Sequence, residues 1–150
     1  MGTPMARRLV DSGFQLAVFD RLAERTHSLV EFGARGGDSP QDACQDAEAL
    51  IIMVMTASQV EDVLFGDDGV AEVLAPRAVV VVMSTIGPDA VRELAERLTA
   101  QDLRVLDAPV SGGVARAEQG NLGAGQPTHY GRRAARSIRR TPTGSGSYGV

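Results

Sequence analysis

Ala49-Leu50-Ile51-Ile52-Met53-Val54-Met55 is a continuous apolar run without alternating polar side chains. Such a run is typical of a strand that is buried on both faces, as in a parallel sheet covered by helices. Residues 78–83 form a second run of the same kind, and shorter apolar segments at 16–19 and 103–106 predict two further strands. Helical patterns lie between these segments. This alternation predicts an α/β fold with a parallel sheet.

The helical segments are marked by their ends and by their apolar stripes. An early Pro4 and a following Gly13 predict a first helix before residue 13. A helix is expected at about 22–32 and a short one from Pro40, with helical turns at 60–64 and 70–74. The clearest helix starts near Pro88 and has its apolar stripe at Val91, Leu94, Ala95 and Leu98.

Length and composition are those of one globular domain. The chain has 150 residues, 43% of them hydrophobic and 23% charged, and no apolar run reaches the length of a membrane span. The start, Met1 to Pro4, lacks the pattern of a signal peptide, so we expect a cytoplasmic protein without membrane contact. The single cysteine, Cys44, excludes an internal disulfide framework and a multi-cysteine zinc site. We expect no metal site.

The C-terminal part differs in charge from the rest of the chain. Residues 1–122 hold all nineteen acidic residues and ten arginines, whereas residues 123–150 hold five arginines and no acid. The segment 123–150 is rich in Arg, Gly, Ser and Thr, which predicts a disordered basic tail. Binding of nucleic acid phosphates by this tail is one hypothesis, but no aromatic platform or motif supports it. We favour an out-of-frame or truncated end.

Polar and glycine residues follow each expected strand, where an open parallel sheet binds its ligands. Asp20 follows the strand at 16–19. A carboxylate there accepts hydrogen bonds from the ribose hydroxyls of NAD, while the neighbouring Arg21 would tolerate NADP. Ser111, Gly112 and Gly113 offer a hydroxyl and a permissive backbone for a carboxylate or phosphate oxygen. For both sites, an ordinary turn without a ligand is the alternative.

Three motifs resemble the β-hydroxyacid dehydrogenases, which include 3-hydroxyisobutyrate dehydrogenase and share their cofactor domain with 6-phosphogluconate dehydrogenase. Residues 1–6, MGTPMA, resemble the end of the family fingerprint G-x-G-x-M-G-x-P-M-A. Residues 83–88, MSTIGP, resemble its M-S-T-I-S-P segment, and residues 107–114, DAPVSGGV, match its substrate loop. The resemblance covers about residues 1–122. It implies a Rossmann-type sheet in residues 1–122, followed by the tail 123–150.

The resemblance also implies a role for individual residues. Gly2 would lie under the cofactor pyrophosphate, Asp20 would bind ribose, and Thr85 would lie near the nicotinamide. The adenosine side would be lined by Met55, Thr56 and Val60. The substrate carboxylate would be held by Ser111, Gly112 and Gly113. The implied cofactor is NAD or NADP, with NAD favoured by Asp20. The implied partners are a small hydroxyacid substrate and, as in the family, further copies of the chain in a homo-oligomer.

The sequence departs from the family pattern at two places. The fingerprint normally starts with a strand and two more glycines, and that strand is the central one of the sheet. We therefore expect a sheet that lacks its first, central strand. The family lysine that acts as general acid and base has no counterpart, because the sequence contains no lysine. His129 stands near the lysine position by spacing, but Pro127 and Gly131 oppose a helix there.

These features lead to three functional hypotheses. In the first, the chain is a fragment of an NAD(P)-dependent hydroxyacid dehydrogenase that has no catalytic residue of its own and negligible turnover. In the second, it is a non-catalytic nucleotide-binding module or the partner of an intact paralogue. In the third, it is an interaction protein with a basic tail. We favour the first.

Overall fold

A computed structural model describes residues 1–124, 128–130 and 147–149 of the chain. Its helices are α1 (Gly2–Asp11), α2 (Ala23–Val30), α3 (Pro40–Ala43), α4 (Ala57–Phe65), α5 (Pro88–Ala100) and α6 (Gly113–Gln119). Its strands are β1 (Gln15–Val18), β2 (Arg35–Gly36), β3 (Ala47–Ile52), β4 (Val79–Val82), β5 (Arg104–Asp107), β6 (Val110–Ser111), β7 (Gly123–Ala124), β8 (Thr128–Tyr130) and β9 (Ser147–Gly149).

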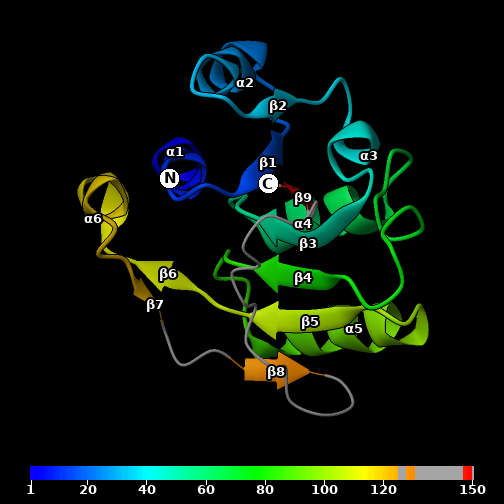
Figure 1. Ribbon diagram of the computed structural model, residues 1–150. Helices are drawn as coiled ribbons and strands as arrows, with labels where there is room; N and C mark the ends of the chain where they lie inside the picture. The colour runs from blue at the N-terminus through cyan, green and yellow to red at the C-terminus, as the bar shows by residue number, and fades with distance from the viewer. Residues whose placement is uncertain (125–127, 131–146, 150) are drawn as a thin grey trace.

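The strands form one large sheet and a small two-stranded one (Figure 1). The large sheet has the order β2-β1-β9-β3-β4-β5-β8. Neighbouring strands are parallel throughout, except for β8, which is antiparallel to β5. The small sheet pairs β6 with β7. The predicted α/β fold with a Rossmann-type parallel sheet is confirmed.

The centre of the sheet is completed by the C-terminal end of the chain. No strand of the described residues precedes α1, and the place between β1 and β3 is taken by β9. Ser147 pairs with Gln15 on one side and with Ala47 on the other, and Gly149 pairs with Ala17 and Leu50. The expected gap is therefore occupied along part of its length, because strand edges with free N–H and C=O groups pair with an extended segment that reaches them.

The expected tail, residues 123–150, is only partly described. It contributes β7, β8 and β9, so the expectation that it forms no folded element is corrected at these residues. His129 lies on β8 opposite Leu106, hence on a strand and not on a helix. The prediction of disorder otherwise concerns residues 125–127, 131–146 and 150, which lie outside the described residues.

The main hydrophobic core lies between β3, β4 and β5 and the helices α4 and α5. The apolar stripe of α5, Val91, Leu94, Ala95 and Leu98, is buried as predicted. It belongs to one cluster with buried strand residues such as Leu50, Val80 and Val105. The opposite side of these strands carries a smaller cluster that contains Ala49, Val79 and Val81. Both faces of the sheet are thus covered at residues 49–52 and 79–82, which explains why the two apolar runs do not alternate there.

A separate cluster joins α1 and α2 to β1. Ala6, Leu16, Val18, Leu29 and Ala34 form its buried part. Outside it, the guanidinium of Arg7 lies 3.8 Å from the centroid of the Phe32 ring, a cation–π distance. Among the described residues, no helix combines the length and the apolar character that crossing a bilayer requires.

Two element boundaries, the end of β3 and the start of α4, differ by three residues from the expected ones. The strand expected to continue to Met55 ends at Ile52, and α4 starts at Ala57 instead of Val60. The reason is a capping box in which Thr56 and Gln59 satisfy each other's backbone N–H groups. Residues 70–74, where helical turns were expected, form turns and bends.

Candidate functional site

The carboxyl ends of the parallel strands bring the predicted site residues to one edge of the sheet. Asp20 follows β1, Met55 follows β3, Thr85 follows β4, and Ser111 lies on β6, shortly after β5. In Figure 1 the arrowheads of β4 and β5 point toward the side where α6 lies. Ligands of open parallel sheets bind outside this edge. We call it the carboxyl edge.

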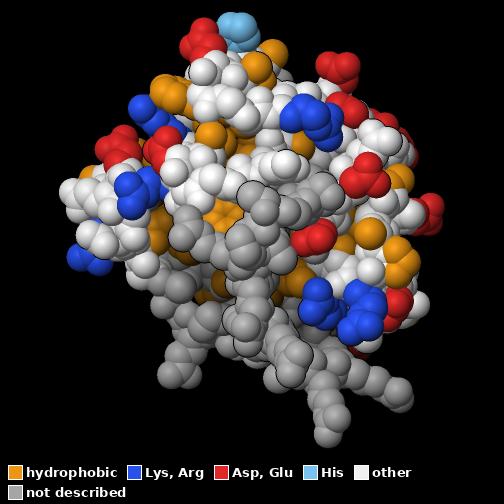
Figure 2. Space-filling view, viewed as in Figure 1, with side chains coloured by type: hydrophobic (Ala, Val, Ile, Leu, Met, Phe, Trp, Pro, Cys, Tyr) orange, Lys and Arg blue, Asp and Glu red, His pale blue; other side chains and the backbone are white. Residues whose placement is uncertain are grey.

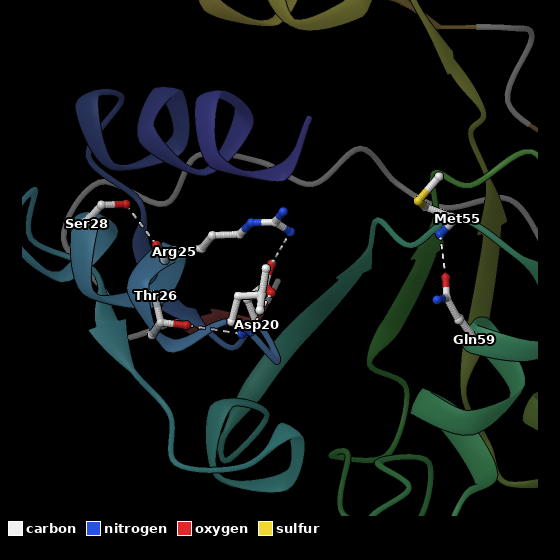
Figure 3. Close-up of polar contacts among 7 residues, drawn as sticks. Asp20, Arg25, Thr26, Ser28, Met55 and Gln59 are labelled. Atoms are coloured by element: carbon white, nitrogen blue, oxygen red, sulfur yellow. Dashed lines mark hydrogen bonds and ion pairs between the residues drawn. The ribbon is translucent and has the colours of Figure 1, made fainter.

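Asp20 is held in a defined conformation between β1 and α2 (Figure 3). Its Oδ1 accepts a hydrogen bond from the Leu22 N–H at 2.9 Å, and its Oδ2 lies 3.4 Å from Nη1 of Arg25. Its own backbone N–H donates to Oγ1 of Thr26 at 3.1 Å. The side chain of Asp20 remains 37% exposed, so its carboxylate oxygens retain accepting capacity toward a ligand.

Arg25 and Thr26 are functional candidates that the sequence analysis missed. The cation that pairs with Asp20 is Arg25 on α2, four residues beyond the exposed Arg21 that was considered. Ser28 donates to the carbonyl of Arg25 at 2.9 Å within α2. The usable signal was a cation in the first turn of the helix that follows β1, five residues after Asp20.

The loop between β3 and α4 presents Met55 and Thr56 as expected candidates. The side chain of Met55 is 88% exposed, while its backbone N–H donates to Oε1 of Gln59 at 2.8 Å. Oγ1 of Thr56 accepts from the N–H of Gln59 at 3.2 Å. Val60, expected to line the adenosine side, has no exposed surface and lies in the main core. Its side chain therefore supports α4 from behind, and a direct ligand contact is not open to it.

Thr85 is exposed, and its neighbour Ser84 is buried at 4% exposure. Among the described residues, Ser84 is the only polar residue classed with the buried core. Its hydroxyl donates to the carbonyl of Val54 at 2.7 Å and accepts from the Val54 N–H at 3.0 Å. Ser84 thus joins the loop after β4 to the loop after β3, a role that the sequence alone did not indicate.

Ser111, Gly112 and Gly113 form the turn from β6 into α6, and all three are exposed. Gly112 has a φ of 123°, and a Cβ built there would lie 2.6 Å from Cδ of Arg116. Gly113 has a φ of 69° with open space around it. The hydroxyl of Ser111 donates to the carbonyl of Gly123 at 3.3 Å across the small sheet. The two glycines are required by the backbone, and Ser111 is accessible.

Gly2 is the first residue of α1, and a Cβ built there would meet nothing within 4 Å. No side chain caps the N-terminus of α1. The first N–H groups of a helix without a capping side chain suit an anion. Asp20 and the start of α1 therefore fit two parts of a dinucleotide: a carboxylate suited to ribose hydroxyls and a helix end suited to pyrophosphate.

Two titratable groups have shifted pKa values. Burial raises the pKa of Asp107, the last residue of β5. Burial also raises the pKa of the Cys44 thiol to about 11, with the Arg35 guanidinium acting weakly in the opposite direction. Cys44 is 2% exposed, which makes it a packing residue and not a nucleophile. The described residues bring together no group of three His, Cys, Asp or Glu side chains suited to a metal ion.

Figure 2 shows acidic and basic side chains interspersed around the described part of one face, without an extended basic patch there. A doubly covered parallel sheet with a carboxylate after one strand and glycine-rich turns after others defines the class of the protein. It is an α/β protein whose sheet edge has the form at which open parallel sheets bind ligands.

Comparison with known proteins identifies the family. Residues 1–134 match the family described as the NAD binding domain of 6-phosphogluconate dehydrogenase. The chain belongs to this family. A 3-hydroxyisobutyrate dehydrogenase of Pseudomonas aeruginosa is 42% identical to it over 122 residues, which are 81% of this chain and 41% of that enzyme. The resemblance to the β-hydroxyacid dehydrogenases is thereby confirmed.

Solved structures with a similar fold include members of the same enzyme type as the sequence relatives. The crystal structure of a 3-hydroxyisobutyrate dehydrogenase from Salmonella typhimurium has a TM-score of 0.78 and 37% identity, covering 82% of this chain and 43% of that one. Psf3, solved in complex with NADP+ and 2-OPP, has a TM-score of 0.77 and 30% identity, covering 83% of this chain and 44% of that one. The chain thus spans less than half the length of these relatives.

Proposed function

We propose that this chain binds NAD or NADP along its carboxyl edge and is the cofactor-binding part of a hydroxyacid dehydrogenase of the 3-hydroxyisobutyrate dehydrogenase type. The family and the relatives support this proposal. The observation that carries it is the geometry of Asp20, whose carboxylate follows β1 and is oriented by the Leu22 N–H and the Arg25 guanidinium. A carboxylate at this place suits the ribose hydroxyls of a dinucleotide.

Each candidate residue receives one role in this proposal. Gly2 and the N-terminus of α1 hold the pyrophosphate, and Asp20 holds the ribose. Met55 and Thr56 line the adenosine side, with Val60 packed behind them, and Thr85 lies near the nicotinamide. The substrate carboxylate is bound by Ser111, Gly112 and Gly113. All of these residues lie within 1–122, which we propose as the cofactor-binding unit, with 123–150 as a separate tail.

NAD is the preferred cofactor in this proposal. The carboxylate of Asp20 repels a 2′-phosphate, which favours NAD. Arg25 at 3.4 Å compensates part of this charge, and Arg21 is exposed beside it, so that NADP is tolerated. NADP+ is the cofactor named in the solved Psf3 complex.

In this proposal the chain's own residues bind and orient the reactants, and no lysine is present among them to move the proton. A bound nicotinamide supplies hydride transfer to or from the substrate carbon. The family acid and base is a lysine, and this sequence contains none. We therefore propose a small hydroxyacid as the substrate class of the full-length type, in a cytoplasmic homo-oligomer, and negligible turnover by these 150 residues alone.

A second candidate function rests on the cofactor-binding residues alone. A chain that binds the cofactor without a proton donor is a nucleotide-binding module, or a partner that an intact paralogue completes. The two candidates differ in whether an added paralogue changes turnover, whereas both require cofactor binding by this chain.

The test is a titration of the purified chain with NADH and with NADPH, followed by cofactor fluorescence. We expect saturable binding with a micromolar dissociation constant and tighter binding of NADH. With 3-hydroxyisobutyrate and NAD+ we expect no turnover above the rate without protein. A lack of binding at millimolar NADH and NADPH would contradict the cofactor role. Turnover at a rate typical of an intact dehydrogenase would contradict the proposal that these 150 residues lack a proton donor.

A further inference from the structure

Three successive backbone N–H groups in the loop between β3 and α4 are bound by two side chains. The Val54 N–H donates to Oγ of Ser84 at 3.0 Å. The N–H groups of Met55 and Thr56 both donate to Oε1 of Gln59, at 2.8 and 3.3 Å. A loop that binds phosphate needs successive N–H groups that point at the anion. The N–H groups of residues 54–56 already donate to side chains of the protein, so they are not available to a phosphate.

Ser84 holds this loop from the side of the sheet. It comes after β4, and both of its hydrogen bonds go to Val54, one donated and one accepted. A hydroxyl that is only 4% exposed and has both partners in one residue is not free for a ligand. A buried polar group with complete partners fixes the geometry around it, because losing either partner leaves an unsatisfied group.

Gln59 holds the same loop from the side of α4 (Figure 3). Its backbone N–H donates to Oγ1 of Thr56, and its side chain accepts from the N–H groups of Met55 and Thr56. Between the two holding residues, the backbone N–H groups of residues 54–56 are all hydrogen-bonded, while Met55 is 88% exposed. It is the most exposed of the large hydrophobic side chains among the described residues.

We propose that Ser84 and Gln59 are positioning residues that hold the 54–56 loop so that Met55 forms an apolar platform for a ring of the bound dinucleotide. This inference rests on the proposed function. An exposed thioether gains by being covered with a flat ring, since apolar area leaves water. The cost of ordering the backbone has been met before binding, which is the advantage of preorganisation. Phosphate is directed away from this loop to the uncapped end of α1.

The experiment compares Ser84→Ala with the unchanged full chain. Without ligand, we expect hydrogen exchange of the Val54 amide to rise at least tenfold. With ligand, we expect the dissociation constant for NADH to rise about 5- to 20-fold, while that for inorganic pyrophosphate stays within twofold. Ser84→Thr retains the hydroxyl and is expected to recover most of the NADH affinity. A general loss of stability would instead weaken the binding of both NADH and pyrophosphate, and Ser84→Thr would not restore it.

Val105→Ala is the matched control, because it removes a buried side chain of the same core without touching the loop. It is expected to lower stability and leave the affinity for NADH unchanged. Gln59→Ala tests the other holding residue from a partly exposed position, where a folding defect is less of a risk than at Ser84. We expect faster exchange at Met55 and Thr56 and a rise in the NADH dissociation constant similar to that of Ser84→Ala.

The outcomes separate this inference from the function on which it rests. A chain that binds NADH, and in which neither variant changes the NADH affinity, refutes the platform while leaving the proposed function intact. Equal weakening of NADH and pyrophosphate binding, or equal weakening by Val105→Ala, also refutes it. An unchanged chain that binds neither NADH nor NADPH refutes the proposed function and the platform together.

Discussion

Replacing Asp20 with asparagine should move the cofactor preference from NADH toward NADPH. The asparagine Oδ1 can still accept the Leu22 N–H that Oδ1 of Asp20 accepts at 2.9 Å, so the turn after β1 is retained. What is lost is one negative charge beside the expected ribose. The substitution therefore tests electrostatics at this position with little change in shape.

The expected magnitude follows from the exposure and the pairing of Asp20. Two unit charges about 4 Å apart interact by about 1 kcal/mol in water and about 4 kcal/mol at an effective dielectric constant near 20. A 2′-phosphate carries a charge of about −1.5 to −2. The 37% exposure of Asp20 and the Arg25 guanidinium at 3.4 Å both reduce the repulsion. We expect about 1–2 kcal/mol, hence NADPH binding that is roughly 5- to 30-fold tighter.

NADH should respond in the opposite direction. A hydrogen bond from a ribose hydroxyl to a charged acceptor contributes about 1.5–3 kcal/mol, against about 0.5–1.5 for a neutral acceptor. The loss of about 1 kcal/mol corresponds to roughly fivefold weaker NADH binding. Fluorescence titrations of both cofactors at low and high salt measure the two effects, since the repulsion is screened by salt.

Asp102→Asn is the matched control for this charge change. Asp102 lies in the turn before β5, at the opposite edge of the sheet, and its φ of 60° is one that asparagine tolerates. It should leave both dissociation constants within twofold. If Asp20→Asn shifts NADH and NADPH affinities equally, or if Asp102→Asn shifts their ratio as much, then Asp20 does not face the ribose.

Three further predictions concern stability and reactivity. Leu98→Ala removes a fully buried side chain of α5 and should lower the free energy of unfolding by about 2–5 kcal/mol in urea titrations, and a loss under 1 kcal/mol would contradict its central place. Cys44, with a pKa of about 11 against the ordinary 9.0, should react with iodoacetamide at pH 8 about 100-fold more slowly in the native chain than in the urea-unfolded one; equal rates would show that the thiol is accessible. Burial raises the pKa of Asp107 in the folded state, so folding favours the protonated carboxyl. The stability that this carboxyl contributes is complete below its ordinary pKa of 3.8 and is lost as the pH rises through its pKa in the folded state. Asp107→Asn should therefore be more stable than the unchanged chain at pH 7, with the difference disappearing near pH 3; a lower stability at pH 7 would contradict the sign.

The parallel sheet could be predicted because its evidence is local. Two unbroken apolar runs, which became β3 and β4, indicate strands covered on both faces, and the stripe of α5 indicates the face that covers them. The edge position of Asp20 followed from the same pattern. Such signals depend only on the period of side chains along one segment.

The remaining features depend on contacts between distant segments. Nothing in Ser147, Tyr148 and Gly149 indicates a central strand, and their pairing with β1 and β3 follows from the open edges there. Ser84 forms its hydrogen bonds with Val54, which lies thirty residues away in sequence. The capping box of α4 was a readable T-x-x-Q pattern at Thr56 and Gln59, and it marks the true start of that helix.

The position of β9 sets the order in which the molecule can assemble. Residues of β3, β4 and β5 can collapse onto α4 and α5 as soon as they are synthesised, because they are near one another along the chain. Among the described residues, β1 is linked to β3 through β9, which lies far from both along the sequence, and closing so long a loop is slow. Ser147–Gly149 is thus expected to pair with β1 and β3 late in folding. Clipping it off should split a single melting transition into two, one for β1 with α1 and α2 and one for the remainder.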